Sequence, residues 1–306
     1  MALRCTLLGL MLGTATWAGP PAAPHVAPLE LRRSMPFVQV LVDGKGPFTF
    51  GVDTGTSSEA LVSPDLAETL GLPSTGAVEA GDPSGKNGRR LPLVRLGRLS
   101  VAGLELQGVT AAVYQPSQAE GRCDGILGFA LFRDQLLTLD YPGLRLVLGP
   151  GRLAPSSDGT VLPFRAPDGV PVVDLVVGTE TVPAVVDSRG SGLALPAARA
   201  ERMKLLGDPV VIGRGRTISG EFEVRGAQLA EDVLLGGYRL RQPFVTLHPS
   251  FPIGNVGGLV LRQLVVTFDQ RSKLLRLEAP ERTLVLPRPQ RPGAPGPADA
   301  GRPPAP

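Results

Sequence analysis

The sequence predicts an all-β protein built from two small lobes. Glycine (39 residues) and proline (32 residues) are abundant and aromatic residues are scarce (5%), which favours many short strands joined by tight turns over a helical bundle. A hydrophobic content of 42% in 306 residues is enough to build a proper core. A sequence pattern that occurs twice along the chain predicts the two lobes.

The clearest internal similarity joins residues 125–140 to residues 254–269. The two segments, GILGFALFRDQLLTLD and GNVGGLVLRQLVVTFD, align without a gap and share Gly128/Gly257 among their identical positions. Apolar residues stand at most of the other positions. Recurrence at this length predicts one structural plan used twice.

An aspartate ends an apolar run upstream of each of these segments. FVQVLVDGKGPFTFGVD ends at Asp53, and PVVDLVVGTETVPAVVD ends at Asp187. Each aspartate is followed directly by a hydroxyl residue and, further on, by a stretch rich in Ala, Glu and Leu with helical propensity. The two lobes are therefore expected at residues 26–150 and 151–284, each with one short helix.

Both ends of the chain have the composition of segments outside the lobes. Residues 1–18 contain an early arginine, a short apolar run and small residues before position 19, which predicts a cleaved signal peptide and export to the periplasm or the medium. The alternative is a buried N-terminal helix. The apolar run is too short to span a bilayer, so no stable membrane insertion is expected. Residues 285–306 are rich in proline and have little to bury, which predicts a disordered tail.

Several chemistries lack the residues that they need. The net charge of +3 comes from scattered arginines without interleaved aromatic residues, which argues against nucleic-acid binding. Only two histidines, His25 and His248, are present, and we interpret His248 as a surface loop residue. The chain therefore has few candidates for the histidine of a Ser-His-Asp triad or a Cys-His pair. Clustered metal ligands are absent, and neither a metal nor a cofactor is expected. Once the signal peptide is removed, Cys123 is the single thiol and is expected to be free.

Asp53 and Asp187 are the candidate catalytic residues. Two carboxylates at hydrogen-bond distance cannot both ionise at low cost, so one keeps a proton while the other activates a water molecule. That water can attack an amide carbonyl polarised by the protonated partner. Hydroxyls of Thr54 and Ser188 can lock the two loops together, and Gly55 permits a close backbone approach. The alternative for Asp53 is a turn residue that bonds its own backbone.

The chain resembles the aspartic peptidases, two-lobed like pepsin and similar to shorter bacterial proteins that look like two fused retroviral-type protease subunits. The resemblance rests on Asp53-Thr54-Gly55-Thr56 and Ile126-Leu127-Gly128 in the first lobe, and on Val185-Val186-Asp187-Ser188 and Asn255-Val256-Gly257 in the second. It implies two small closed β-barrels with the aspartate loops at the base of a cleft, supported by the two glycines. It also implies a peptide or protein substrate bound as an extended strand.

Two turn-rich segments between the aspartate and glycine motifs are candidate lids. AGDPSGKNGRR (80–90) and GRGRTISGEF (213–222) occupy equivalent places in the two lobes. Within them the candidate substrate-binding residues are Gly81, Ser84, Gly85, Gly215 and Thr217. Either segment can instead be an ordinary surface loop.

Arg189 departs from the pattern, because the second loop reads DSRGSG where glycine is expected after Ser188. In the place of Gly55, its guanidinium is expected beside Asp187, favouring the ionised carboxylate. Alternatively, Gly190 serves as the turn residue. Two functions follow: an exported aspartic endopeptidase, which the sequence favours, and a degenerate peptidase-like module that binds peptides without cutting them. Two lobes in one chain are compatible with a monomer, and the sequence leaves the oligomeric state open.

Overall fold

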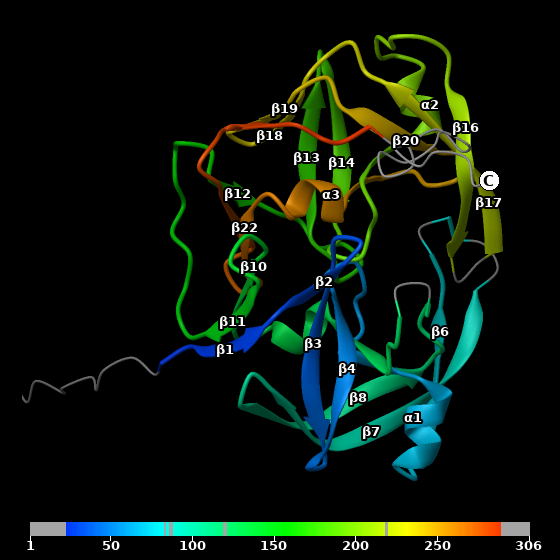
Figure 1. The fold of residues 1–306 in the computed structure, drawn as a ribbon, viewed down its shortest axis with the longest axis vertical. Helices are drawn as coiled ribbons and strands as arrows, with labels where there is room; N and C mark the ends of the chain where they lie inside the picture. Colours follow the sequence, from blue (N-terminus) through cyan, green and yellow to red (C-terminus); the bar gives the residue numbers. More distant parts are fainter. Residues whose placement is uncertain (1–22, 83, 86–87, 119–120, 218–219, 289–306) are drawn as a thin grey trace, which may run out of the picture.

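The chain folds almost entirely into β-strands, which confirms the predicted all-β class. The computed structural model describes residues 23–82, 84–85, 88–118, 121–217 and 220–288. Figure 1 shows a first sheet at the bottom, a second sheet at the top and a third sheet, which we call the shared sheet, at the side between them. The predicted signal peptide, residues 1–18, lies outside the described residues.

The first sheet has eight strands and closes on itself. Its order is β2 (Glu30–Arg32), β3 (Met35–Val42), β4 (Lys45–Asp53), β9 (Gly125–Gly128), β5 (Ala60–Val62), β8 (Leu104–Val113), β7 (Arg89–Val101) and β6 (Ser74–Ala80). An additional pairing of β3 with β7 closes the row of strands. Helix α1 (Pro64–Thr69) begins after Ser63, whose hydroxyl accepts a hydrogen bond from the Leu66 N–H at 3.1 Å. The 3-10 helix η1 (Phe129–Phe132) follows β9.

The second sheet has ten strands and stays open. Its order is β16 (Val210–Thr217), β17 (Gly220–Gln228), β20 (Phe244–His248), β15 (Leu193–Pro196), β21 (Gly254–Val256), β14 (Glu180–Val186), β13 (Val172–Val177), β18 (Val233–Leu235), β19 (Tyr238–Leu240) and β24 (Thr283–Leu284). In the described part of the chain, β16 and β24 do not pair with each other. The expected closed barrel is therefore formed by the first sheet and not by the second. The second half contains two short helices, α2 (Ala197–Ala200) and α3 (Gly258–Leu261), whereas one was predicted.

The shared sheet joins the two halves of the chain. Its order is β1 (His25–Pro28), β11 (Arg145–Gly149), β10 (Leu136–Asp140), β22 (Val265–Asp269), β23 (Leu274–Glu278) and β12 (Val161–Pro163). Strands β10 and β22 belong to the two segments that align in the sequence, and they pair antiparallel with Thr138 opposite Thr267. The two Oγ1 atoms lie 2.9 Å apart. Equivalent residues of the two segments therefore meet in the shared sheet.

Buried aliphatic and aromatic side chains from all three sheets form one cluster. Leu286 is part of this cluster and is 8% exposed, so the packed chain continues past residue 284 and the predicted tail begins too early. The rest of that tail, from residue 289, lies outside the described residues. Within the described residues, no helix has the length and the apolar character needed to cross a bilayer.

Candidate active site

Buried strands bring both candidate aspartates to corresponding places in the two sheets. Asp53 is the last residue of β4, which pairs in parallel with β9 so that Asp53 lies opposite Gly128. Asp187 directly follows β14, which pairs in parallel with β21, and its N–H donates to the Val256 carbonyl at 3.0 Å. The residues before each aspartate are buried, whereas the aspartates themselves are half-buried. Each carboxylate therefore emerges where its strand leaves the core.

Glycines allow the chain to pass close to itself at this place. A Cβ added to Gly128 would collide with the Ser58 carbonyl oxygen, and one added to Gly257 would lie 2.6 Å from the Gly190 carbonyl oxygen. A Cβ on Gly55 would lie 2.6 Å from Cγ of Asp187. Contacts this short are forbidden to any larger residue, so these glycines are required for the observed approach of the loops.

Thr54 and Ser188 join the two aspartate loops by reciprocal hydrogen bonds. The Thr54 N–H donates to Ser188 Oγ at 2.9 Å, and the Ser188 N–H donates to Thr54 Oγ1 at 3.0 Å. The Thr54 hydroxyl donates to the Val186 carbonyl at 2.7 Å, and the Ser188 hydroxyl donates to the Val52 carbonyl at 2.7 Å. Both side chains are fully buried. The two loops, 134 residues apart in sequence, are thus held as one unit.

Asp53 retains a proton more readily than an ordinary aspartate does. Burial and the neighbouring charge of Asp187 raise the pKa of Asp53 to about 7, and a hydrogen bond between the two carboxyl groups acts in the same direction. The charge of Arg189 and the Gly55 N–H, which donates to Asp53 Oδ1 at 2.8 Å, oppose this rise. At acidic and near-neutral pH the pair can therefore hold one proton between two carboxylates.

Asp187 accepts more hydrogen bonds than Asp53 does. The N–H groups of Arg189 and Gly190 donate to its Oδ1 at 2.9 and 2.8 Å, and the Asn255 side-chain amide donates to its Oδ2 at 2.7 Å. Sequence reasoning missed the role of Asn255. The available signal was its place opposite Ile126 in the internal alignment, where a polar residue interrupts an otherwise apolar strand.

Arg189 follows Ser188 in the loop, as predicted, but its side chain leaves Asp187. The guanidinium lies against Gly51 of β4, and its Cζ is 5.1 Å from the centre of the Phe37 ring. No ion pair joins Arg189 to Asp187 within the described part of the chain, and the charge of Arg189 acts on Asp53. The expected pairing with Asp187 is therefore wrong. Gly190 also donates to Asp187, so both residues contribute to the second turn.

Two pockets flank the aspartates, one on each side. The first, about 470 Å³, is lined by Asp53, Gly55, Thr56, Ser57, Ser58, Leu61, Val78, Glu79, Ala80, Gly81, Asp82, Leu91, Ala112, Tyr114, Ile126 and Phe251. The second, about 350 Å³, is lined by Met35, Asp187, Arg189, Gly190, Ser191, Gly192, Ala194, Gly215, Phe222, Val224, Thr246, Leu247, His248, Phe251 and Asn255. Because Phe251 lines both, the pockets are neighbours along one cleft.

The candidate lids are the ends of two hairpins, β6–β7 and β16–β17, which Figure 1 shows on the same side of the molecule. Gly81 lies in the first pocket and Gly215 in the second. Ser84 and Gly85 instead form a turn with Asp82, whose side chain accepts from the Ser84 N–H at 2.9 Å and whose carbonyl accepts from the Gly85 N–H at 3.0 Å.

Thr217 belongs to the end of the second hairpin, where its backbone pairs with Gly220. Neighbouring residues 218–219, like residues 83 and 86–87 of the first hairpin, lie outside the described residues. The structure therefore brings Gly81 and Gly215 to the cleft, and it leaves Ser84 and Gly85 out of the pocket linings.

His248 ends β20 and lines the second pocket, so its interpretation as a surface loop residue is wrong. Its Nδ1 accepts hydrogen bonds from the Ser250 and Phe251 N–H groups at 3.3 and 3.1 Å. The imidazole stacks on the Phe251 ring with 3.5 Å between centroids. Burial lowers the pKa of His248, an effect that the charge of Asp82 opposes. His248 therefore acts here as a neutral anchor for the aromatic wall of the cleft.

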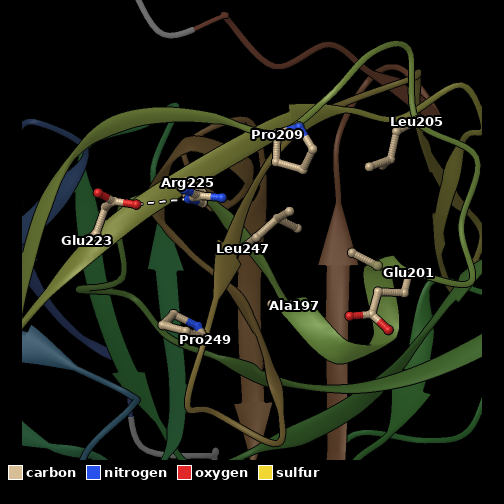
Figure 2. Close-up of a pocket in the computed structure, with 9 residues that line it drawn as sticks. Ala197, Glu201, Leu205, Pro209, Glu223, Arg225, Leu247 and Pro249 are labelled. Carbon is tan, nitrogen blue, oxygen red and sulfur yellow. Dashed lines mark hydrogen bonds and ion pairs between the residues drawn. The ribbon is translucent and has the colours of Figure 1, made fainter.

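A further pocket of about 460 Å³ lies behind the β16–β17 hairpin (Figure 2). Glu223 and Arg225 of β17, which form an ion pair, line this pocket, whereas Phe222 and Val224 of the same strand line the cleft. Successive side chains of a strand point to opposite faces of its sheet. This pocket therefore lies on the opposite face of the hairpin from the cleft, and Leu247 lines both.

Cys123 is a free, buried thiol whose Sγ donates to the Gly125 carbonyl at 3.1 Å. Burial raises the pKa of the Cys123 thiol. Among the described residues, no cluster of three or more His, Cys, Asp or Glu side chains is arranged to hold a metal ion.

Comparisons with known proteins find a similarity for part of the chain. No curated protein matches the chain. Residues 38–131 match the model of a family described as aspartyl protease. The matched segment contains the Asp53 loop and Gly128, and it ends before the Asp187 loop. The matched residues contain most of the strands of the first sheet, so this part of the chain is similar to an aspartyl protease family.

Proposed function

We propose that the chain is an exported aspartic endopeptidase that hydrolyses peptide bonds with a water molecule activated by Asp53 and Asp187. The observation that carries this proposal is the joining of the two aspartate loops by Thr54 and Ser188, which holds both carboxyl groups at one cleft. The match of residues 38–131 to an aspartyl protease family supports the same chemistry.

The reaction requires one protonated and one ionised carboxyl group. The ionised carboxylate takes a proton from water while the water oxygen forms a bond to the amide carbon. The protonated carboxyl hydrogen-bonds to the carbonyl oxygen as negative charge develops there. The tetrahedral intermediate then breaks its C–N bond, and the nitrogen leaves with a proton from the pair. No further reactant is consumed.

An extended peptide fits the cleft as a substrate. The two pockets at Asp53 and Asp187 can receive side chains that project from successive residues of an extended strand, because these point in opposite directions. The β6–β7 hairpin ends beside Gly81 and the β16–β17 hairpin contains Gly215, which line the two pockets, so both hairpins can cover the peptide. The oligomeric state is not constrained by this arrangement, because one chain supplies both carboxylates.

An internal duplication accounts for the two-part site. In both halves the aspartate strand pairs in parallel with the glycine strand, which also pairs antiparallel with a third strand, β5 in one half and β15 in the other. Export rests on residues 1–18 alone and is tested separately by the N-terminal sequence of protein recovered from the periplasm or medium. An uncleaved chain in the cytoplasm contradicts export.

A second candidate function is a peptide-binding module without catalysis. The observation that favours it is Arg189 at a position where Gly55 stands in the first half, because its charge works against the proton that the pair must hold. The two candidates differ in one measurable property, which is the appearance of new peptide ends.

The test is incubation of the purified full chain with fluorescein-labelled casein between pH 3 and pH 8, with and without pepstatin. The endopeptidase is expected to release soluble fragments, to be inhibited by pepstatin and to lose activity in Asp53→Asn. Binding of casein peptides without any fragments across this range supports the binding module instead. Circular dichroism of Asp53→Asn controls for loss of fold.

A further inference from the structure

Asn255 places an amide beside one aspartate only. It lies on β21 opposite Val185 of β14, and its Nδ2 donates to Asp187 Oδ2 at 2.7 Å. In the first sheet the corresponding register pairs Ile126 of β9 with Gly51 of β4. Ile126 is apolar and has nothing to donate to Asp53. The two halves are thus alike in backbone and different in this side chain.

We propose that Asn255 is a positioning residue that keeps Asp187 ionised, so that the shared proton resides on Asp53 and Asp187 is the base that activates water. This inference rests on the proposed function and assigns the two roles within it. Asn255 itself does not take part in bond making. It acts through the carboxylate to which it donates.

The hydrogen bonds around the pair support this assignment. Asp187 accepts three, from the N–H groups of Arg189 and Gly190 and from Asn255, and these involve both of its oxygens. Asp53 accepts one such bond, from the Gly55 N–H. Hydrogen bonds donated to a carboxylate favour its ionised form. A proton on Asp187 Oδ2 would meet the Asn255 amide donor, whereas on Asp53 the N–H of Gly55 donates to Oδ1, and a proton on the other oxygen can be donated to the Asp187 carboxylate.

The charge of Asp187 acts in the same direction, whereas the charge of Arg189 lowers the pKa of Asp53 and opposes it. Burial and the Asp187 charge raise the pKa of Asp53, which is what a proton resident on Asp53 requires. The other titratable groups around Asp187 are Arg189 and His248, which line the same pocket, and Tyr141, on whose hydroxyl the charges of both aspartates act. Burial raises the pKa of Tyr141 and lowers the pKa of His248, so both shifts favour the neutral form of the side chain.

Asn255 is an unfavourable residue for its position in β21, which indicates that its side-chain amide has a function. Asparagine is disfavoured in strands, where residues such as isoleucine are preferred. A Cβ on Gly190 would collide with Oδ1 of Asn255, so the loop must carry glycine at 190 for the amide to fit. The chain therefore gives up strand propensity and side-chain freedom at two positions in order to hold this one hydrogen bond.

The first test does not depend on activity. The chain is labelled with ¹³C at aspartate carboxyl carbons, and the signals of Asp53 and Asp187 are assigned from their disappearance in Asp53→Asn and Asp187→Asn. In the parent, Asp187 is expected to stay ionised to lower pH than Asp53. In Asn255→Leu, which has a similar volume and no donor, protonation of Asp187 is expected about one pH unit higher. Asp187 titrating above Asp53, or an unmoved Asp187 signal in Asn255→Leu, overturns the inference.

The second test uses a peptide that the parent is found to cut from casein. The acidic limb of its pH–rate profile is expected to move up by about one pH unit in Asn255→Leu and to return toward the parent in Asn255→Ser, which restores a donor. Gln39→Leu is a matched control, since it removes an amide from β3 that donates to Thr49 Oγ1 at 3.1 Å. If Asn255→Leu does not fold, the pH–rate profile of Asn255→Ser decides. An acidic limb at the parent's pH or at a higher pH supports the inference, and an acidic limb at a lower pH overturns it.

The two failures are distinguishable. A parent that cuts nothing defeats the proposed function, while the carboxyl titration can still support the assignment to Asn255. A parent that cuts peptides while Asn255→Leu leaves both the profile and the carboxyl titration unmoved defeats the inference and leaves the peptidase intact.

Discussion

The guanidinium of Arg189 occupies the space where a side chain on Gly51 would stand. A Cβ added to Gly51 would lie 3.1 Å from Cζ of Arg189 and would collide with its Nη1. In the other half, Val185 corresponds to Gly51 and Gly55 corresponds to Arg189, and a Cβ added to Gly55 would lie 2.6 Å from Cγ of Asp187. The departure at Arg189 is therefore matched by a small residue in the opposite half.

Gly51→Ala is expected to destabilise the protein through Arg189. In the parent the new methyl group displaces the guanidinium, at a cost of about 1–3 kcal/mol in the free energy of unfolding. In an Arg189→Gly background the same substitution is expected to be nearly neutral. The measurement is urea unfolding of the four proteins of the cycle. Equal destabilisation in both backgrounds would show that the two residues do not interact.

Removal of the Arg189 charge is expected to extend activity toward higher pH. The guanidinium lowers the pKa of Asp53, so Arg189→Met allows Asp53 to keep its proton to higher pH. The alkaline limb of the pH–rate profile, expected near the Asp53 pKa of about 7, then moves up by as much as about one pH unit. Arg189→Lys keeps the charge and serves as the control. A downward shift in Arg189→Met contradicts the sign of this interaction.

Thr54→Val is expected to destabilise the chain and to loosen the cleft. It leaves the Ser188 N–H and the Val186 carbonyl without their hydrogen-bond partners in a buried place, which costs about 1–3 kcal/mol for each unpaired group. Thr110→Val is the control, because it removes a hydroxyl from the exposed face of β8 and leaves no buried group without a hydrogen-bond partner. Thermal unfolding measured side by side checks the difference. Equal melting temperatures for the two variants exclude a stabilising role for the joined loops.

Cys123 is expected to react slowly with iodoacetamide and to be unnecessary for hydrolysis. Burial of the thiol and its raised pKa both suppress the reactive thiolate. Mass spectrometry locates the label, and the denatured chain gives the rate for an accessible thiol. Rapid labelling of Cys123 in the folded protein, with parallel loss of casein cleavage, contradicts this expectation.

Local patterns in the sequence were sufficient for much of the fold and of the site. The repeated run of apolar residues ending in Asp53 and Asp187 predicted where both carboxylates emerge, because burial of a strand and exposure of its following turn are local properties. The hydroxyls of Thr54 and Ser188 follow these aspartates directly, so their mutual hydrogen bonds could be anticipated once the loops were expected to meet.

Features that depend on distant partners could not be read in the same way. The pairing of β10 with β22 joins residues 129 positions apart, and similarity of two segments does not reveal that they lie side by side. The direction of the Arg189 side chain depends on the absence of a side chain at Gly51. His248 belongs to the cleft because the Ser250 and Phe251 N–H groups hold its ring, a contact that composition does not predict.

The most direct test of the two-carboxylate site is the rate of casein cleavage by Asp187→Asn, because Asp187 lies outside the segment that matches an aspartyl protease family. The amide keeps the size of the side chain and cannot serve as a base or share the proton. We expect cleavage to fall at least about a hundredfold, as in Asp53→Asn, while circular dichroism and the melting temperature stay near those of the parent. Cleavage at the parent's rate by a folded Asp187→Asn protein would contradict the account, since Asp187 would then not be the partner of Asp53.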